Sequence, residues 1–368
     1  MSGLVIHLQT QRERCGLSRS ELAERTGLSR QSIHSIEQGK YIPSTLVALQ
    51  LSQALKCSVE DLFQLASQEL PVAMWASEKE TQSGAQVRVA KVGNRLVAHP
   101  LTGPERFLHT TDALVQEVEA GQVRLSPVTS PELWNHTLML AGCDPAFALL
   151  QQNGPEQRIQ TVHATSLEGL ELLKAGQVHA TGIHLHDPEG QTFNLPFLEK
   201  AGLQGCMVVS LWTWQQGLLV ARGNPLHIQS LNDLTRPNVR LVQRQSSAGS
   251  RILLDALLRE ASVDLSQITL TPTEAQSHQE VAQQVLSGQA DVGLALQAVA
   301  EGAGLDFIPL VQERFDLVVA PAHQNHPVLQ KLLLHLKSPV LRQSVQALGG
   351  YDPSQAGEVL QWAGQGTP

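Results

Sequence analysis

Aromatic and charged residues are scarce in this chain of 368 residues. Phe, Trp and Tyr together make up 4% of it, so the cores have to be built mainly from Leu, Val, Ile and Ala. Charged residues make up 16% and hydrophobic residues 42%, a balance that indicates folded domains and excludes a disordered chain. A chain of this length is expected to form two or three domains.

Signals for membrane insertion and secretion are also missing. No stretch approaches the roughly eighteen uncharged apolar residues that a membrane-spanning helix requires. The first residues lack the basic start and the apolar run of a secretory signal. The cysteines lie far apart without a CxxC pair, so we expect reduced thiols, used mostly for packing, in a cytoplasmic protein: Cys15, Cys57, Cys143 and Cys206.

Enzyme motifs are absent as well. The sequence has neither a Gly-rich nucleotide-binding pattern nor the signatures of metalloproteases and serine hydrolases. We therefore expect a protein that is not an enzyme. One alternative is a metal-assisted or acid–base enzyme that uses His184, His186 and Asp187. Another is a cytoplasmic ligand-binding protein whose N-terminal head contacts protein rather than DNA.

Charge is divided unevenly along the chain. Residues 1–65 hold seven Lys/Arg and six Asp/Glu, whereas the remainder holds 19 and 28. The net charge of −8 therefore belongs to the body of the protein. A near-neutral head on an acidic body permits contact with nucleic acid only through the head.

Residues 1–65 have the pattern of five short helices. Ser18 followed by Glu21 predicts a capping box, Gly27 permits a left-handed turn, and Ser29 can cap the next helix. A first helix is expected from Leu4. A fourth is expected to begin near Pro43 and Ser44, with four leucines as its core: Leu46, Leu49, Leu51 and Leu55.

This head resembles the Cro/repressor (XRE-type) helix-turn-helix family over about sixty residues. The resemblance rests on Gly16-Leu17-Ser18, Gly27-Leu28-Ser29 and Ile33-x-x-Ile36-Glu37-x-Gly39. It implies that residues 29–37 enter the major groove of DNA. It also implies the DNA contacts, with Arg30, Gln31 and Ser35 at base edges, Ser32 on the same helix, and Ser18 and Lys40 at phosphates. A protein-binding or dimerisation module is the alternative, since a net charge of +1 is modest for a DNA binder.

Residues 66–133 are expected to form a linker and a small β/α connecting region. Residues 77–86 have linker composition, and residues 87–97 alternate around Gly93-Asn94 as a hairpin does. A helix is expected from about Leu114 to Gly121. No chemistry is evident in this region.

Residues 134–350 alternate between strand and helix patterns, which predicts parallel sheets covered by helices. The pattern restarts near residue 230, so two similar lobes are expected, followed by a C-terminal tail at 351–368. Separate strands are expected at 307–310 and 317–320. The chain is expected to cross between the lobes near Gly223-Asn224-Pro225 and near Phe315–Val318.

Several motifs of this region resemble the substrate-binding domains related to periplasmic molybdate-binding proteins. They include Gly142-Cys143-Asp144-Pro145 and, later in the chain, Ala290-Asp291-Val292-Gly293. The resemblance implies an α/β, two-lobed type 2 periplasmic-binding-protein fold behind an all-α head. It implies a ligand-responsive transcription regulator that binds a DNA operator as a homodimer and has no membrane partner. No resident cofactor is expected, and the ligand is a small molecule, with an oxyanion such as molybdate as one candidate.

Candidate ligand contacts follow the ends of strands, where ligands bind in open sheets of this type. The segment from Ser246 to Arg251 opens a helix and could hold an anion through backbone N–H groups. Departures from the family at Ser246–Ala248 and Ser250 leave the identity of that anion open. A metal among the histidines is the less favoured reading, and none is assigned. The full expected set is Asp144, His184, His186, Ser246, Ser247, Gly249, Ser250, Arg251 and His278.

Overall fold

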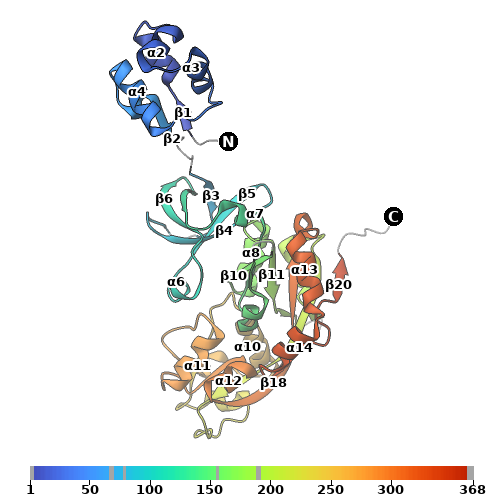
Figure 1. Cartoon of the computed structure of the whole chain (residues 1–368). Coiled ribbons are helices and arrows are strands. Elements are labelled where there is room, and N and C mark those ends of the chain that lie inside the picture. Colours follow the sequence, from blue (N-terminus) through green and yellow to red (C-terminus); the bar gives the residue numbers. More distant parts are fainter. Residues whose placement is uncertain (1–3, 66–69, 78–79, 155–156, 188–191, 363–368) are drawn as a thin grey trace. The chain divides into compact units, whose positions relative to one another are not determined.

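The computed structural model describes residues 4–65, 70–77, 80–154, 157–187 and 192–362 (Figure 1). The chain divides into two compact units, Met1–Leu70 and Pro71–Pro368. Parts of the expected linker and tail, residues 66–69, 78–79 and 363–368, lie outside the described residues. Within the described ranges, no helix combines the length and the apolar character needed to cross a membrane.

The first unit is a compact set of short helices closed by a two-stranded sheet (Figure 1). Leu22, Ile33 and Leu51 are fully buried at its centre. Its elements are β1 (Leu4–Ile6), α1 (Leu8–Arg14), α2 (Arg19–Thr26), α3 (Arg30–Glu37), α4 (Thr45–Leu55), α5 (Val59–Leu62) and β2 (Phe63–Leu65).

The expected helix caps are confirmed, and two details of the first unit are corrected. Ser18 and Glu21 form the capping box of α2, and Gly27 ends that helix with φ of 69°. Residues from Leu4 form β1 rather than a helix, because they pair with β2 from the far end of the unit. Leu46 and Leu49 of α4 are 65% and 49% exposed, since only the face carrying Leu51 and Leu55 meets the core.

The second unit begins with a closed barrel, in the strand order β3-β5-β4-β6-β7. Val87, Val89 and Val115 are fully buried in its core. The expected hairpin around Gly93-Asn94 is confirmed by the pairing of β4 with β5. The elements are β3 (Val72–Trp75), β4 (Gln86–Val92), β5 (Arg95–Pro100), α6 (Glu105–Leu108), β6 (Ala113–Glu119), β7 (Gln122–Pro127) and α7 (Pro131–Asn135).

The helix expected over residues 114–121 is wrong, because β6 occupies this stretch. Ala113 and Val115 alternate into the barrel core. Ala120 and Gly121 both take positive φ, as a tight two-residue hairpin turn requires, and β7 pairs back on β6. Cross-strand pairing therefore determined this segment rather than local helix propensity.

Buried polar contacts fasten the barrel to the neighbouring lobe. Arg158 of β10 (Arg158–His163) forms an ion pair with Asp112, whose other carboxylate oxygen accepts the backbone N–H of Val89. The ring of His179 joins the lobe to the barrel, since its Nδ1 accepts the N–H of Met139 in the lobe and its Nε2 donates to the carbonyl of Lys91 in the barrel. Burial lowers the pKa of His179 to about 3, so the ring is neutral when it makes these bonds.

The remainder of the unit is two α/β lobes built on one continuous sheet, in the order β16-β15-β17-β14-β18-β11-β8-β10-β9. The strands of the first lobe are β8 (Thr137–Gly142), β9 (Gln152–Asn153), β10 (Arg158–His163) and β11 (Ala180–Ile183). Those of the second are β15 (Arg240–Val242), β16 (Thr269–Leu270) and β17 (Val292–Leu296). Within each lobe the core strands β8, β10 and β11, or β15, β16 and β17, pair in parallel, as expected.

Two long strands, β14 (Met207–Val220) and β18 (Asp306–Val319), join the lobes. They pair antiparallel along their length, and β18 is one strand where two were expected. The beginning of β14 pairs with the part of β18 that also pairs with β11 of the first lobe. Gln216–Val220, at the end of β14, pair with β17 of the second lobe. The chain therefore crosses from one lobe to the other near residues 210–216 of β14 and back near residues 311–316 of β18. This range includes Phe315 but not Gly223–Pro225, which lies beyond the end of β14.

Helices and short strands cover this sheet (Figure 1). The segment from residue 351, expected as a tail, instead adds β19 and β20 to the sheet by pairing with β14. Tyr351 is buried there and anchors the segment. The covering elements, with the 3-10 helices labelled η, are η1 (Pro145–Leu150), α8 (Ser166–Lys174), β12 (His186–Asp187), β13 (Thr192–Phe193), α9 (Leu195–Ala201), η2 (Leu231–Thr235), α10 (Gly249–Glu260), η3 (Leu265–Gln267), α11 (His278–Leu286), α12 (Gln297–Ala303), η4 (Pro321–His323), α13 (Pro327–Leu336) and α14 (Pro339–Gln346). The two added strands are β19 (Tyr351–Asp352) and β20 (Val359–Trp362).

Candidate functional sites

Helix α3 carries the expected base-reading residues on its exposed side. Ser29 caps the helix by accepting the N–H of Ser32, and Ile33 and Ile36 bury the opposite face. Arg30 and Gln31 are exposed at the first turn, beside His34, and with Arg19 they line one shallow depression. This arrangement leaves both long side chains free to reach an external partner.

The remaining expected DNA contacts differ in how free they are. Lys40 is exposed, and Ser35 is partly exposed. The hydroxyl of Ser32 lies 2.8 Å from the Ser29 hydroxyl, so it supports the cap. The backbone N–H of Ser18 donates to Glu21, and that carboxylate beside it would repel a phosphate, so only the Ser18 hydroxyl is left to donate.

A buried ion pair holds α3 in place. Glu37, at the end of the helix, accepts hydrogen bonds from Arg12 Nε and Arg19 Nε, each at 2.6 Å. Burial opposes ionisation of this carboxyl, but the two arginines outweigh it and lower the pKa of Glu37 below its usual value. Arg12 is 6% exposed and serves this internal role.

In the second unit, the two lobes touch at the ends of their strands. Ser247 donates its hydroxyl to Glu168 of α8, and its carbonyl accepts the N–H of Leu167. Gly249, the first residue of α10, lies so close to His184 that a Cβ there would be 2.1 Å from the His184 carbonyl oxygen. The expected close approach at Gly249 is therefore made by the opposite lobe.

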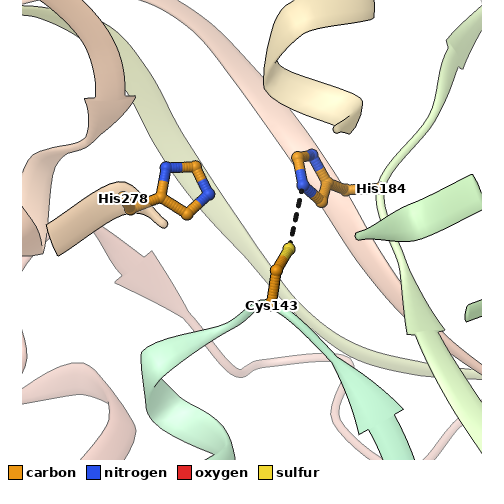
Figure 2. A group of neighbouring side chains, drawn as sticks. All are labelled: Cys143, His184 and His278. Carbon is orange, nitrogen blue, oxygen red and sulfur yellow. Dashed lines mark hydrogen bonds between the residues drawn. The ribbon is translucent and has the colours of Figure 1, made fainter. Parts of the chain in front are cut away.

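Three side chains from both lobes converge at this contact (Figure 2). Cys143 follows β8, His184 follows β11, and His278 begins α11 of the second lobe. The Cys143 sulfur and one ring nitrogen of each histidine lie within 4.8 Å of one another. All three residues are buried. Of the three expected histidines, His184 and His278 are thus brought together.

Glu313 of β18 lies behind His184. Its Oε2 accepts hydrogen bonds from His184 Nδ1 at 3.0 Å, from Trp214 Nε1 at 3.4 Å, and from Gln216 Nε2. Burial disfavours the imidazolium, but the neighbouring Glu313 carboxylate outweighs it and raises the pKa of His184 to about 10. Cys143, His184 and Glu313 also lie in the sequence of contacts found in a catalytic triad, in which a thiol is the nucleophile, an imidazole is its base and a carboxylate orients the imidazole. The Cys143 thiol is only 4% exposed, so the lobes would have to open for a substrate to reach it.

Asp144, expected as a ligand contact, is occupied by the protein itself. Oδ1 accepts from the Tyr351 hydroxyl at 2.7 Å and from the Ala146 N–H at 2.9 Å, while Oδ2 accepts from Trp212 Nε1 at 2.7 Å. Burial raises the pKa of Asp144 to about 6 despite these donors. The residue therefore ties the end of β8 to the C-terminal strands.

In the segment at 246–251, the two donors expected to contact an anion, the Ser250 hydroxyl and the Arg251 guanidinium, differ in their surroundings. The Ser250 hydroxyl is buried and has no hydrogen-bond partner among the described residues. Arg251 instead forms ion pairs with Asp255 at 3.1 Å and Glu274 at 3.4 Å. Ser246 is exposed, with its side chain at the surface.

Arg244 is the functional candidate that the sequence analysis missed in this segment. It is 2% exposed, and Nε and Nη1 have no partner within the described part of the chain, while Nη2 donates to the Gln276 carbonyl. Burial lowers its pKa, and its charge in turn contributes to a pKa of His278 well below the usual value, after burial itself. Its position just after β15 was the available signal.

His186 does not join the cluster. It lies on β12 with its ring edge-on to Phe193 at 5.3 Å between centroids. Both of its ring nitrogens are buried, with no partner among the described residues. The side chain of Asp187 lies outside the described parts, so the alternative site of His184, His186 and Asp187 is not assembled here. Cys143, expected to be a packing residue, lies with His184 and His278 instead.

Comparison with known proteins matches both units. Residues 147–337 match the family model of the PBP superfamily domain, and residues 8–62 match that of the helix-turn-helix. The chain is 29% identical to the uncharacterized protein YvgK of Bacillus subtilis (strain 168) over 228 residues, which are 61% of this chain and 73% of YvgK. The head is 43% identical, over 54 residues, to the uncharacterized HTH-type transcriptional regulator YgzD of the same organism, which covers 15% of this chain and 82% of YgzD.

Among solved structures, the regulatory domain of CcmR from Synechocystis PCC6803, in complex with 2-PG, aligns with a TM-score of 0.41. It is 14% identical, and the alignment covers 54% of this chain and 94% of that chain.

Proposed function

Because the chain belongs to the PBP superfamily domain family and carries a helix-turn-helix domain, it is a ligand-binding regulator, and we propose that it senses an anionic small molecule. In this proposal it acts on DNA as a cytoplasmic homodimer. The domain boundaries we propose are a head at 1–65, a connecting barrel at 66–133 and a ligand domain from 134.

One observation carries the anionic ligand: buried donors lie beside the lobe contact without acceptors. In the described residues, two guanidinium nitrogens of Arg244 and the Ser250 hydroxyl have no partner. Ser250 also sits in the first turn of α10, a twelve-residue helix whose N-terminal end favours negative charge. Each charge-assisted hydrogen bond to a bound anion is worth about 1.5–3 kcal/mol.

These donors suit a tetrahedral oxyanion or an organic ligand with a carboxylate or phosphate group. Molybdate is one oxyanion of this class. Ser246 and Ser247 are weaker candidates, since Ser247 already contacts Glu168. Asp144 and Arg251 are no longer proposed as direct contacts, because both are engaged within the protein.

The ligand can be sought by titrating the full chain with molybdate, sulfate, phosphate and small carboxylates. Trp214 contacts both His184 and Glu313, so its fluorescence should report binding. Arg244→Gln should weaken binding on the order of 10- to 100-fold for one to two lost charge-assisted bonds. Arg240→Gln is the matched control, because Arg240 begins β15, the strand that Arg244 follows, but pairs with Asp291 at the surface. Equal affinities of the two variants would refute the anion site.

The DNA role rests on the exposed first turn of α3 with Arg30 and Gln31. A homodimer is supported by Leu46 and Leu49, which are three residues apart on the exposed side of α4. Sedimentation of the wild type and of Leu46→Lys tests the dimer, which should weaken in the variant. A selection of bound DNA from random sequences tests the operator. If the full chain retains no DNA but still binds ligand, the alternative of a ligand-binding protein whose head contacts protein rather than DNA would be supported instead.

A further inference from the structure

The cluster of Cys143, His184 and His278 is unusual because its members come from three separated segments and both lobes. Their ligating atoms lie within 4.8 Å of one another in the protein interior (Figure 2). Chance packing of buried polar groups is unfavourable unless each group is paired. The convergence therefore calls for a bound partner.

His278 gives the clearest sign of that partner. It is fully buried, and neither ring nitrogen has a hydrogen-bond partner within the described part of the chain. A neutral imidazole in this state has an unused lone pair. A metal ion satisfies such a lone pair without needing a donor from the protein.

His184 is oriented as metal-binding histidines are. Its Nδ1 donates to Glu313 at 3.0 Å, so Nε2 is the nitrogen left to bind a metal ion, which would displace the Nε2 proton. Nε2 lies 3.5 Å from the Cys143 sulfur. A carboxylate behind a ligating histidine fixes the tautomer and raises the basicity of the ring.

The spacing suits a tetrahedral ion. Zn–S bonds of about 2.3 Å and Zn–N bonds of about 2.0–2.1 Å place neighbouring ligand atoms roughly 3.3–3.8 Å apart. Cys143 and His184 already have this spacing at 3.5 Å. The widest separation in the cluster, up to 4.8 Å, would have to shorten by roughly 1–1.5 Å when the metal ion binds.

We propose that Cys143, His184 and His278 bind a zinc-class transition metal ion across the contact between the lobes. One thiolate and two imidazoles suit zinc and its neighbours, whereas magnesium and calcium prefer oxygen ligands. Three protein ligands leave a fourth position for water or a small molecule. The Cys143 thiolate and Glu313 balance the charge of a divalent ion, so Arg244 is left to receive an anion. The proposal goes beyond the regulator function and requires neither DNA nor the anion.

The test is zinc binding by the purified full chain, in competition with a chromogenic chelator and without DNA or candidate anions. The wild type should bind one equivalent. Cys143→Ser and His278→Gln should each weaken zinc affinity on the order of 100-fold or more, and Glu313→Gln by roughly 10- to 100-fold. Cys206→Ser and His186→Gln are matched controls from outside the cluster, and both should bind zinc as the wild type does.

Cobalt provides a second readout that does not depend on the stability of a variant. Wild-type protein loaded with Co²⁺ should show a thiolate-to-metal charge-transfer band and the intense visible bands of tetrahedral coordination. Absence of both bands would overturn the proposal, as would wild-type zinc affinity in folded Cys143→Ser. Rapid alkylation of Cys143 in zinc-saturated protein would also overturn it and would favour a reactive Cys143–His184 pair. A failure of DNA binding would leave all these measurements unaffected.

Discussion

Gln31 and Lys40 differ in what each offers to DNA, although both are exposed on the helix-turn-helix unit. Gln31 can make two hydrogen bonds to one adenine from the first turn of α3, whereas Lys40 is a flexible charge in the following turn. Gln31→Ala should relax base preference at one position of each half-site, at a cost of about 1–3 kcal/mol. Lys40→Ala should weaken all sequences alike and reduce the salt slope by about 1. Equal losses of specific and non-specific binding in Gln31→Ala would contradict the assignment.

Glu37 determines whether α3 is held in position. Its side chain is fully buried between Arg12 and Arg19, and Arg12 is itself buried. Replacement by Gln leaves a buried guanidinium without its counter-charge, which should lower the stability of this unit by about 3 kcal/mol. Hydrogen exchange of the amides in α2 and α3 measures the loss. Glu24→Gln, an exposed change on α2, serves as the control and should leave exchange unchanged.

The same carboxylate predicts a pH dependence with a definite sign. The folded-state pKa of Glu37 lies below its usual value of about 4.5, so its contribution is complete above that pH. The contribution is lost as the pH falls through the folded pKa. Protection of α3 should therefore decrease on acidification below about pH 4.5 in the wild type and less so in Glu37→Gln. Parallel curves for the two proteins would exclude this role.

At the scale of elements, His179 is the acid-sensitive link between the barrel and the first lobe. Its neutral ring joins Met139 of β8 to Lys91 of β4, and it contacts the rings of His323 and His326 at 4.6 and 5.0 Å. Burial lowers the pKa of His179 to about 3, far below the 6.5 of an unfolded histidine. Between these pH values the unfolded chain binds a proton that the native chain does not, so stability falls as the pH is lowered from 6.5.

This link should contribute a slope of about 1.4 kcal/mol per pH unit between pH 6 and pH 4. His179→Gln keeps a donor and an acceptor but does not titrate, so the slope should decrease by one proton. Part of the slope will persist, because burial also lowers the pKa values of His323 and His326. Urea unfolding followed by tryptophan fluorescence measures the slope at each pH. The exposed His136→Gln is the control, and identical slopes for both variants would refute the role of His179.

Local signals in the sequence predicted those elements whose structure is determined locally. Ser18, Glu21 and Gly27 specify the ends of α2 whatever the rest of the chain does, and residues 87–97 form the expected hairpin. Strand β6 was mistaken for a helix because its partners, β4 and β7, are supplied by other segments. Residues 307–320 read as two strands because β18 serves both lobes in turn.

The prediction of site residues divides in the same way, between local signals and contacts that only the folded chain supplies. Strand ends pointed to His184, Ser250 and His278 because such ends collect at one edge of a sheet, and the structure places all three near the contact between the lobes. Composition could not tell Arg244 from Arg251, since only the fold supplies Asp255 and Glu274 to neutralise Arg251. Cys143 was predicted to be a packing residue because His184 lies 41 residues away in the sequence and His278 lies farther still. Only the folded lobes bring these segments together.

At the scale of the whole ligand domain, Gly249 controls how closely the lobes approach. A Cβ at this position would lie 2.1 Å from the His184 carbonyl oxygen and 2.7 Å from its ring, both in the other lobe. The backbone of Gly249 does not require glycine, since its φ is not positive, and Ala is a better helix former for the start of α10. Gly249→Ala should therefore leave each lobe folded but prevent the contact seen here, and the lobes can separate where the strands β14 and β18 cross between them, near residues 210–216 and 311–316.

Small-angle scattering of the full chain should then show a more open particle in Gly249→Ala, with weaker ligand binding. Ligand shifts an equilibrium only through different affinities for two states, so operator affinity in this variant should respond less to ligand than in the wild type. Gly302→Ala is the matched control, because a Cβ at that helical position would have no atom of the described residues within 4 Å. Identical scattering and ligand affinity in Gly249→Ala and Gly302→Ala would mean that the contact between Gly249 and His184 is not part of ligand binding.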